Sequence, residues 1–262
     1  MTARPFVMAH RLQSLGVIVG LLATWEISCR IFGISTLILP PPSAILVRFV
    51  DLIVSGVIWP HLAATLTAVL SGFGLGVLAG LVSGAVISLV PVVERLVYPY
   101  VVALQTVPKI AIAPLFIIWF GYGVASKIVI TALVCFFPVL VSVMAGFHST
   151  DRDQLDMMKA FGATRLQILM RLRLPSALVL IFAGLEIAAV MAVIGAVVGE
   201  FVGAQQGLGY LITALNFSLD VPGVFAVLIF LSLIGISLHS IVRAAARRFV
   251  FWIRREQTPI VT

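Results

Sequence analysis

Apolar residues occur along this chain in long, uniform runs, and charged residues are confined to the segments between them. Six runs have about the 20 residues that a helix needs to cross the hydrocarbon of a bilayer. They cover residues 12–33, 62–90, 96–120, 124–147, 177–203 and 222–246. Strands of a membrane barrel would be shorter and would alternate in polarity. The pattern therefore predicts an all-α, polytopic membrane protein with about six transmembrane helices.

The composition supports the same class. Hydrophobic residues make up 61% of the chain and charged residues 10%, whereas about a quarter of the residues of a soluble globular protein are charged. The first run is too long and its flanks are too polar for a cleaved signal peptide, so we treat it as a span. We expect residues 1–262 to form a single transmembrane domain.

Basic residues predict the orientation, because Lys and Arg near the ends of spans stay on the cytoplasmic side. With the N-terminus inside, the cytoplasmic set is Arg4, Arg11, Arg95, Arg152, Lys159, Arg165, Arg171, Arg173, Arg243, Arg247, Arg248, Arg254 and Arg255. The outer or membrane set is only Arg30, Arg48, Lys109 and Lys127. Both termini are thus predicted to be cytoplasmic. Topology also accounts for the net charge of +7, so we expect no nucleic-acid partner.

The segment 151–175, DRDQLDMMKAFGATRLQILMRLRLP, is a charged island between two apolar runs. Its apolar positions recur at helical spacings, Gly162 interrupts two short helical stretches, and Pro175 is expected to end the second. On the side that the arginines mark as cytoplasmic, this pattern predicts a helix-turn-helix that docks on another protein.

One ionisable residue lies near the middle of a span. Residues 96–120 contain Lys109, and we expect Pro99, Pro108 and Pro114 to break the helix there. A lysine at a helix centre costs about 2.5–3.5 kcal/mol, so it needs water, free carbonyls or a carboxylate. Glu186 and Glu26 are the candidate partners.

Two interpretations of this lysine remain open. In the first, Lys109 forms a structural ion pair with one of the two glutamates or reaches toward the interface. In the second, Lys109 and Glu186 lie on the path of a solute.

Two spans carry glycines at every fourth position, which leaves one helix face without side chains. The series are Gly72, Gly76, Gly80 and Gly84, then Gly195, Gly199 and Gly203. They predict close helix contact, either as static packing in one chain or along a moving, pore-lining or dimer interface. After the prolines at 40–42, Ser43 is expected to cap a short helix on the outer interface.

Catalytic chemistry is not evident. None of Lys109, Lys127 and Lys159 follows the glycine of a phosphate-binding loop. The histidines at 10, 61, 148 and 239 and the cysteines at 29 and 135 lack the spacing of a metal site. We therefore expect no enzymatic activity, no cofactor and no metal.

With these features established, the island resembles the EAA loop of binding-protein-dependent ABC importer permeases, in which E-A-A-x-x-x-G precedes I-x-L-P by a fixed spacing. Here the pattern is Asp156-Met157-Met158 with Gly162, then Leu172-x-Leu174-Pro175. Aspartate replaces the glutamate and two methionines replace the alanines. The glycine and the L-P pair keep their spacing.

Other stretches resemble the branch of these permeases that serves alkanesulfonates, taurine, nitrate and pyrimidine or flavin-type vitamin precursors. They are LPPPSAI (39–45), TLTAVLSGFGLGVLAG (65–80), QTVPKIAIAPLFIIWFGYG (105–123) and GAVVGEFVGAQQGLGYLI (195–212). The resemblance implies the type I importer permease fold in a bacterial inner membrane. It also implies a second copy of this chain, two ATPase subunits at the cytoplasmic face and a periplasmic or lipid-anchored solute-binding protein.

The resemblance also assigns a role to the bend of the island. Its exposed residues would sit in a groove of the ATPase and transmit nucleotide-driven closure to the spans. They are Asp156, Lys159, Ala160, Phe161, Gly162 and Ala163.

Two other functions compete with this one. An ion-coupled secondary transporter or channel would use Lys109, Glu26 and Glu186 as titrating residues and would show inverted repeats, which the sequence does not display. A scaffold that acts only by interaction would leave the proline-broken span without a purpose. The transporter or channel alternative gives the charged island no role.

Overall fold

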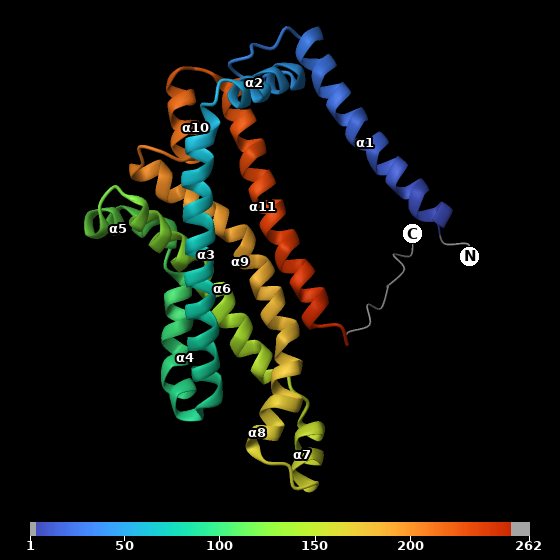
Figure 1. The fold of residues 1–262 in the computed structure, drawn as a ribbon, viewed down its shortest axis with the longest axis vertical. Coiled ribbons are helices and arrows are strands. Elements are labelled where there is room, and N and C mark those ends of the chain that lie inside the picture. Colours follow the sequence, from blue (N-terminus) through green and yellow to red (C-terminus); the bar gives the residue numbers. More distant parts are fainter. Residues whose placement is uncertain (1–3, 253–262) are drawn as a thin grey trace.

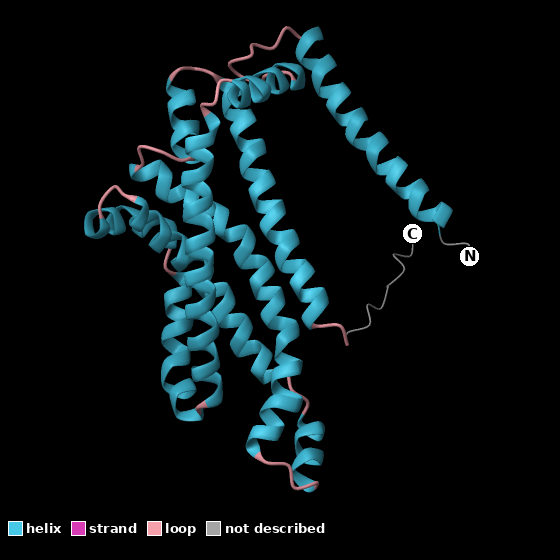
Figure 2. Ribbon diagram, viewed as in Figure 1, coloured by secondary structure: helices cyan, strands magenta, loops and turns pink. Residues whose placement is uncertain are grey.

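The computed structural model describes residues 4–252, with side chains from residue 16 onward, and this part of the chain contains no strand (Figures 1 and 2). Its helices are α1 (Arg4–Ile31), α2 (Pro42–Val54), α3 (Ile58–Leu89), α4 (Pro91–Thr106), η1 (Lys109–Ile112), α5 (Ala113–Phe120), α6 (Val124–His148), α7 (Arg152–Ala160), α8 (Arg165–Ile168), η2 (Leu169–Arg173), α9 (Leu174–Gly203), α10 (Leu208–Phe217) and α11 (Val221–Phe249). The all-α prediction is confirmed.

Four helical segments are long and apolar enough to cross a membrane, namely α3, α6, the continuous segment 165–203 and α11. The pair of α4 with η1 and α5 makes a fifth if the broken segment counts as one span. Helix α1 matches the predicted first span, but the side chains before residue 16 are not described. The total of six spans therefore stays a prediction. Arg254 and Arg255 of the orientation argument lie outside the described residues.

Helix α6 is the centre of the bundle and packs against both α3 and α9. Both glycine series face it except for Gly203, which faces Ile117 of α5 and Tyr122. A Cβ on Gly76 would lie 2.5 Å from the carbonyl oxygen of Ala132, and one on Gly195 would lie 2.9 Å from Cα of Thr131. The glycines thus let two helices approach the α6 backbone within one chain. The idea that these faces serve a dimer interface is wrong, because other segments of the same chain already cover them.

The predicted third span is broken, with an angle of 81° between α4 and the segment 109–120. The break falls at Val107 and Pro108, and Pro114 starts α5. Val107 is extended, with φ −65° and ψ 126°, as residues before proline usually are. Pro99 was expected to break the helix as well. That expectation is wrong, because α4 continues through Pro99.

The bundle has two distinct ends (Figure 1). Helices α7 and α8 project from one end, while α2, α10 and the start of α11 gather at the other. Helix α1 leans away from the bundle and is joined to it near its C-terminal end, where the ring of Trp25 lies 6.1 Å from that of Phe225 in α11. We call these the α7–α8 end and the α2–α10 end. Helix α10 forms in a connection that the sequence reading left without structure.

The N-terminus of α2 is held by a carboxylate from α1. Glu26 accepts hydrogen bonds from the backbone N–H of Ser43 at 3.0 Å and from its hydroxyl at 2.8 Å. Negative charge is favourable at a helix N-terminus, where backbone N–H groups lack partners. The expected cap by Ser43 is therefore wrong. Ser43 lies inside the first turn and donates to Glu26, which has been recruited from another helix.

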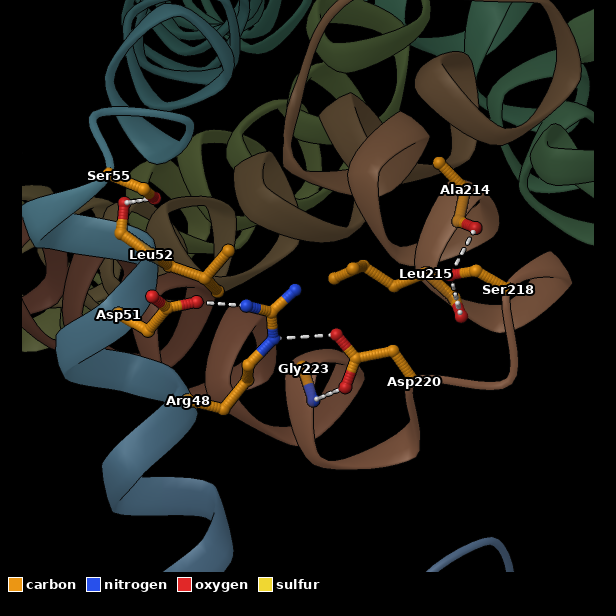
Figure 3. A network of polar contacts seen from close by, with 9 residues as sticks. All are labelled: Arg48, Asp51, Leu52, Ser55, Ala214, Leu215, Ser218, Asp220 and Gly223. Atoms are coloured by element: carbon orange, nitrogen blue, oxygen red, sulfur yellow. Dashed lines mark hydrogen bonds and ion pairs between the residues drawn. The ribbon is translucent and has the colours of Figure 1, made fainter.

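An ion-pair cluster ties α2 to the start of α11 (Figure 3). Nε of Arg48 lies 2.6 Å from Oδ2 of Asp220, and the same guanidinium contacts Asp51 one turn along α2. Asp220 also accepts a hydrogen bond from the N–H of Gly223 at 2.9 Å, which caps α11. The hydrogen bond to Asp220 raises the pKa of Arg48 above its ordinary value. One carboxylate thus starts α11 and also anchors α2.

Candidate functional site

The island folds into two short helices joined by a tight bend. Asp151 caps α7 by accepting a hydrogen bond from the N–H of Asp153 at 2.9 Å. The helix ends at Ala160, and Gly162 follows two residues later with a φ of +75°. The N–H of Ala163 then donates to the carbonyl of Met158 at 3.0 Å, and that of Gly162 to Lys159 at 2.9 Å. This is the usual glycine-terminated helix end, so the predicted bend at Gly162 is confirmed.

The second helix starts with a reciprocal cap. The Thr164 hydroxyl accepts from the N–H of Gln167, and the Gln167 side chain accepts from the N–H of Thr164 at 2.8 Å. Pro175 was expected to end this helix, and that expectation is wrong. The chain passes from α8 through the π-helical turn η2 into α9, and Pro175 lies in the first turn of α9, where proline needs no N–H partner. The bend is therefore connected rigidly to the 30-residue helix α9.

The bend exposes apolar and charged side chains together. Phe161 is 83% exposed, Lys159 pairs with Asp156 at 2.8 Å, and no residue of α7 or α8 is buried. The hydrogen bond from Lys159 lowers the pKa of the Asp156 carboxyl, but such an exposed pair adds little to stability. The other large apolar side chains exposed here are Met157, Leu166 and Met170. Exposed apolar groups ringed by charges are typical of a protein-docking surface.

Lys109 lies at the first position of η1, directly after the break in the third span. Its Nζ donates to the carbonyl of Gln105 at 3.0 Å and lies 4.7 Å from the ring centre of Phe137 in α6. The released carbonyl and the aromatic face therefore stabilise the ammonium. Within the described residues, Lys109 forms no ion pair.

The two glutamates considered as its partners are placed elsewhere. Glu26 pairs with Arg30 at 2.6 Å. Glu186 lines a hollow of about 230 Å³ between α9 and α11, together with Arg243 and Arg247. The expected ion pair of Lys109 with either glutamate is therefore wrong. The titrating set that an ion-coupled transporter would need is not assembled in this chain.

A buried polar cluster at the α2–α10 end was missed by the sequence reading. Glu200 is 1% exposed and Thr65 is fully buried. The Thr65 hydroxyl donates to Oε1 of Glu200 at 2.7 Å and accepts from the N–H of Leu208 at 2.7 Å. The N–H of Gly209 donates to Oε2 of Glu200, also at 2.7 Å. The cluster thus fixes the start of α10 against α3 and α9.

Lys127 and His61 complete this cluster. Lys127 is 4% exposed, and its Nζ donates to the carbonyl of Gln206 at 2.6 Å. His61 accepts through Nδ1 from the N–H of Gly207 at 3.1 Å. The signal for this cluster was visible, since Glu200 and Lys127 are ionisable residues inside apolar runs. The sequence reading placed Lys127 in the outer or membrane set and passed over Glu200.

A family model matches this architecture. Residues 72–251, from the middle of α3 past the end of α11, match the model for the "Binding-protein-dependent transport system inner membrane component". The match includes the α7–α8 bend and, from the buried cluster, Lys127, Glu200 and the start of α10, whereas His61 and Thr65 precede it. The chain belongs to this permease family.

Individual relatives agree with the family. The permease is 43% identical over 216 residues to the formylaminopyrimidine transport permease protein ThiX of Halalkalibacterium halodurans, which covers 82% of this chain and 86% of the relative. It is 36% identical to the riboflavin transport system permease protein RibX of Chloroflexus aurantiacus, and the alignment covers 88% of this chain and 87% of the relative. It is 32% identical to the taurine transport system permease protein TauC of Escherichia coli, and the alignment covers 91% of this chain and 89% of the relative.

These matches confirm the expected resemblance. The protein is a multi-pass membrane permease of the ABC importer class, in the branch of the sulfonate, taurine and pyrimidine-precursor permeases. Members of this family transport small solutes and are not enzymes.

Proposed function

We propose that this permease is one half of the membrane pathway of an ATP-driven importer for a small anionic or heterocyclic organic solute. Sulfonates, nitrate and pyrimidine or flavin-type vitamin precursors are the candidate solutes. The observation that carries the proposal is the α7–α8 bend, with Gly162 at φ +75° and Phe161 exposed beside it. The relatives named for formylaminopyrimidine, riboflavin and taurine transport support a small organic solute.

In this proposal, residues 1–262 form a single transmembrane domain with both termini and the α7–α8 end in the cytoplasm. Two copies of the chain enclose the path, and two ATPase subunits bind the two bends. A solute-binding protein delivers cargo at the α2–α10 end. The ATPase contacts are Asp156, Lys159, Ala160, Phe161, Gly162 and Ala163, and the continuous segment 165–203 supports mechanical transmission from the bend into the membrane.

We also propose that Lys109 borders the path. It follows the break in the third span and is only half-buried. Glu186 would act elsewhere, at the hollow between α9 and α11. The two predicted path residues therefore contribute separately, and no contact between them is required.

The coupling proposal is tested by copurification of the ATPase with tagged permease. Gly162→Val forces a side chain into a left-handed conformation and strains the bend by about 1 kcal/mol or more, and Asp156→Lys reverses a charge of the docking surface. We expect both variants to recover much less ATPase than the wild type. Gly74→Val is the matched control, because a Cβ at Gly74 meets no atom within 4 Å and its φ is ordinary. Undiminished recovery with both variants would refute the docking surface.

A further inference from the structure

Two hollows follow one another along the pair of helices α9 and α11, which pack side by side (Figure 1). The hollow nearer to the α7–α8 end has a volume of about 230 Å³ and contains Arg243 and Arg247. The other has a volume of about 690 Å³ and is apolar except for Ser232 and His239. Residues three or four apart share a helix face. The lining positions recur at these spacings, at 179, 183, 186, 190 and 193 in α9 and at 228, 232, 235, 239, 243 and 246 in α11. The two hollows are thus parts of one groove, which we call the α9–α11 groove.

The end of the groove near α7 and α8 carries positive charge. Arg243 and Arg247 are exposed, lie one turn apart and form no ion pair within the described residues. Glu186 lies in the same hollow and offsets one of the two charges, so one positive charge remains. Guanidinium groups bind phosphate through paired hydrogen bonds. Topology explains why arginines end α11 on this side, but not why two of them share a hollow that continues into an apolar groove.

The apolar part of the groove has the length of a lipid chain. Leu228 and Arg243 are about 22 Å apart along α11, at 1.5 Å per residue. One leaflet contributes about half of the 30 Å hydrocarbon thickness. Apolar side chains of the wall remain 40–46% exposed in the single chain, namely Val190, Ile194 and Leu228. An acyl chain that starts at the arginines can therefore lie along this wall.

His239 lies between the basic and apolar parts, one turn from Arg243 and one turn from Gly235. It lines the apolar hollow, and its Nδ1 is buried without a hydrogen-bond partner among the described residues. Nε2 is therefore the ring nitrogen left for a ligand in the groove. In a phospholipid, the ester carbonyls lie between the phosphate and the acyl chains. A donor at the level of His239 matches them.

We infer that the α9–α11 groove binds an anionic phospholipid. Its phosphate lies between Arg243 and Arg247, an ester carbonyl accepts from His239, and one acyl chain fills the apolar hollow. Basic pockets between helices on the cytoplasmic side of a membrane suit such headgroups. The Glu186 carboxylate accepts from a headgroup hydroxyl, which points to phosphatidylglycerol. This contact would replace the path role proposed for Glu186 and leaves that of Lys109 unchanged.

A helix from a second copy of the chain is the rival occupant of an apolar groove. Helix α1 is the candidate, since it leans away from its own bundle (Figure 1). At the cytoplasmic end, however, its charged residues are Arg4 and Arg11. They bring no anion to the arginines of the groove, whereas a phospholipid supplies one.

Native mass spectrometry of the purified full-length permease tests the inference. Phosphatidylglycerol, phosphatidylethanolamine and phosphatidylcholine with the same acyl chains are added in turn, and the bound fraction is measured. We expect phosphatidylglycerol to bind best. Arg243→Gln and Arg247→Gln should each reduce its preference over phosphatidylcholine about fivefold, because one basic residue near anionic lipid contributes about that factor. Inorganic phosphate at the same concentration should not displace the lipid.

Arg248→Gln is the matched control for the headgroup. Arg248 ends the same helix, is exposed and lines neither hollow, so its loss should leave the preference unchanged. Gly235→Leu tests the apolar part. A Cβ there makes only an ordinary contact, 3.7 Å from Cγ2 of Val193, while the longer side chain fills the groove and should weaken binding of all three lipids.

Three results would each overturn the lipid site. They are equal binding of phosphatidylglycerol and phosphatidylcholine, a preference that survives both Arg243→Gln and Arg247→Gln, and a lipid-free dimer in which a cysteine in α1 crosslinks to Ile236→Cys of the groove. Displacement of the lipid by inorganic phosphate would show a simple anion site instead. Copurification of the ATPase does not depend on these outcomes, so the importer function is tested separately.

Discussion

At the scale of single residues, Thr65 has two roles in the buried cluster. Its hydroxyl donates to Glu200 and accepts from the N–H of Leu208. Thr65→Val keeps the shape and removes both hydrogen bonds, which leaves a carboxylate oxygen and a backbone N–H buried without this partner. Each such group costs about 1–3 kcal/mol. We expect a clear fall in the thermal unfolding temperature of the detergent-solubilised protein.

Thr67→Val is the control for this substitution. Thr67 lies two residues further along α3, is exposed, and its hydroxyl bonds only to the carbonyl of Ala63 at 2.8 Å. The unfolding temperature of the Thr67→Val variant should stay at the wild-type value. Equal unfolding temperatures for the two variants would show that the cluster does not stabilise the α2–α10 end.

Lys109 gives a second prediction at this scale. A residue that borders a solute path is reached by water, so Lys109→Cys should react with a membrane-impermeant thiol reagent. The native cysteines, Cys29 and Cys135, are buried and should stay unlabelled. Ile118→Cys, at an apolar position 76% exposed on α5, is the control that we expect to face lipid, and it should react slowly. Labelling of Ile118→Cys but not of Lys109→Cys would contradict the path assignment.

Prediction of single residues from the sequence succeeded where the local backbone conformation favours one residue type. Gly162 was predicted at the bend because glycine tolerates a positive φ, and its φ is +75°. Glu200 could not be placed, because its partners come from α3 and from the first turn of α10, and the partner in α3 is more than a hundred residues away. Long-range partners of a buried carboxylate are not visible in local sequence.

At the scale of helices, the contact between α3 and α6 depends on glycines, which have no side chain to keep the two backbones apart. A Cβ on Gly76 would lie 2.5 Å from the carbonyl oxygen of Ala132 and 2.9 Å from Cβ of Cys135. Gly76→Ala must therefore push α3 away from α6, and overpacking of this kind costs about 1–3 kcal/mol. We expect a lower unfolding temperature, measured as for Thr65.

Gly74→Ala isolates the effect of this contact. It places the same methyl group on the same helix, where no atom lies within 4 Å, so it should leave stability unchanged or raise it slightly through helix propensity. If Gly76→Ala were as stable as Gly74→Ala, the close approach of the two helices would be refuted.

Helix positions followed from the apolar runs because span length is set by bilayer thickness. The predicted run 124–147 became α6 at Val124–His148, and 177–203 became α9 at Leu174–Gly203. The prolines were less informative. Pro108 ends a helix where Val107 becomes extended, whereas Pro99 is accommodated within α4, and composition does not separate the two cases. Helix α10 was missed because its ten residues are too short for a span signal.

At the scale of the whole molecule, we predict that the permease works as a homodimer. The chain has at most about six spans and shows no internal duplication, so one copy provides half of a pathway. The mass of the solubilised complex, measured by light scattering with detergent subtracted, should correspond to two copies of this chain. One copy beside a different permease would contradict the homodimer and leave family membership intact.

The central claim is that the α7–α8 bend docks on an ATPase, and site-directed crosslinking tests it most directly. Phe161→Cys and Phe217→Cys put a thiol at two positions of nearly equal exposure, 83% and 84%, but at opposite ends of the bundle. In membranes that contain the ATPase, we predict a crosslink from position 161 and none from position 217. A crosslink from position 217 alone would contradict the orientation and the docking surface together.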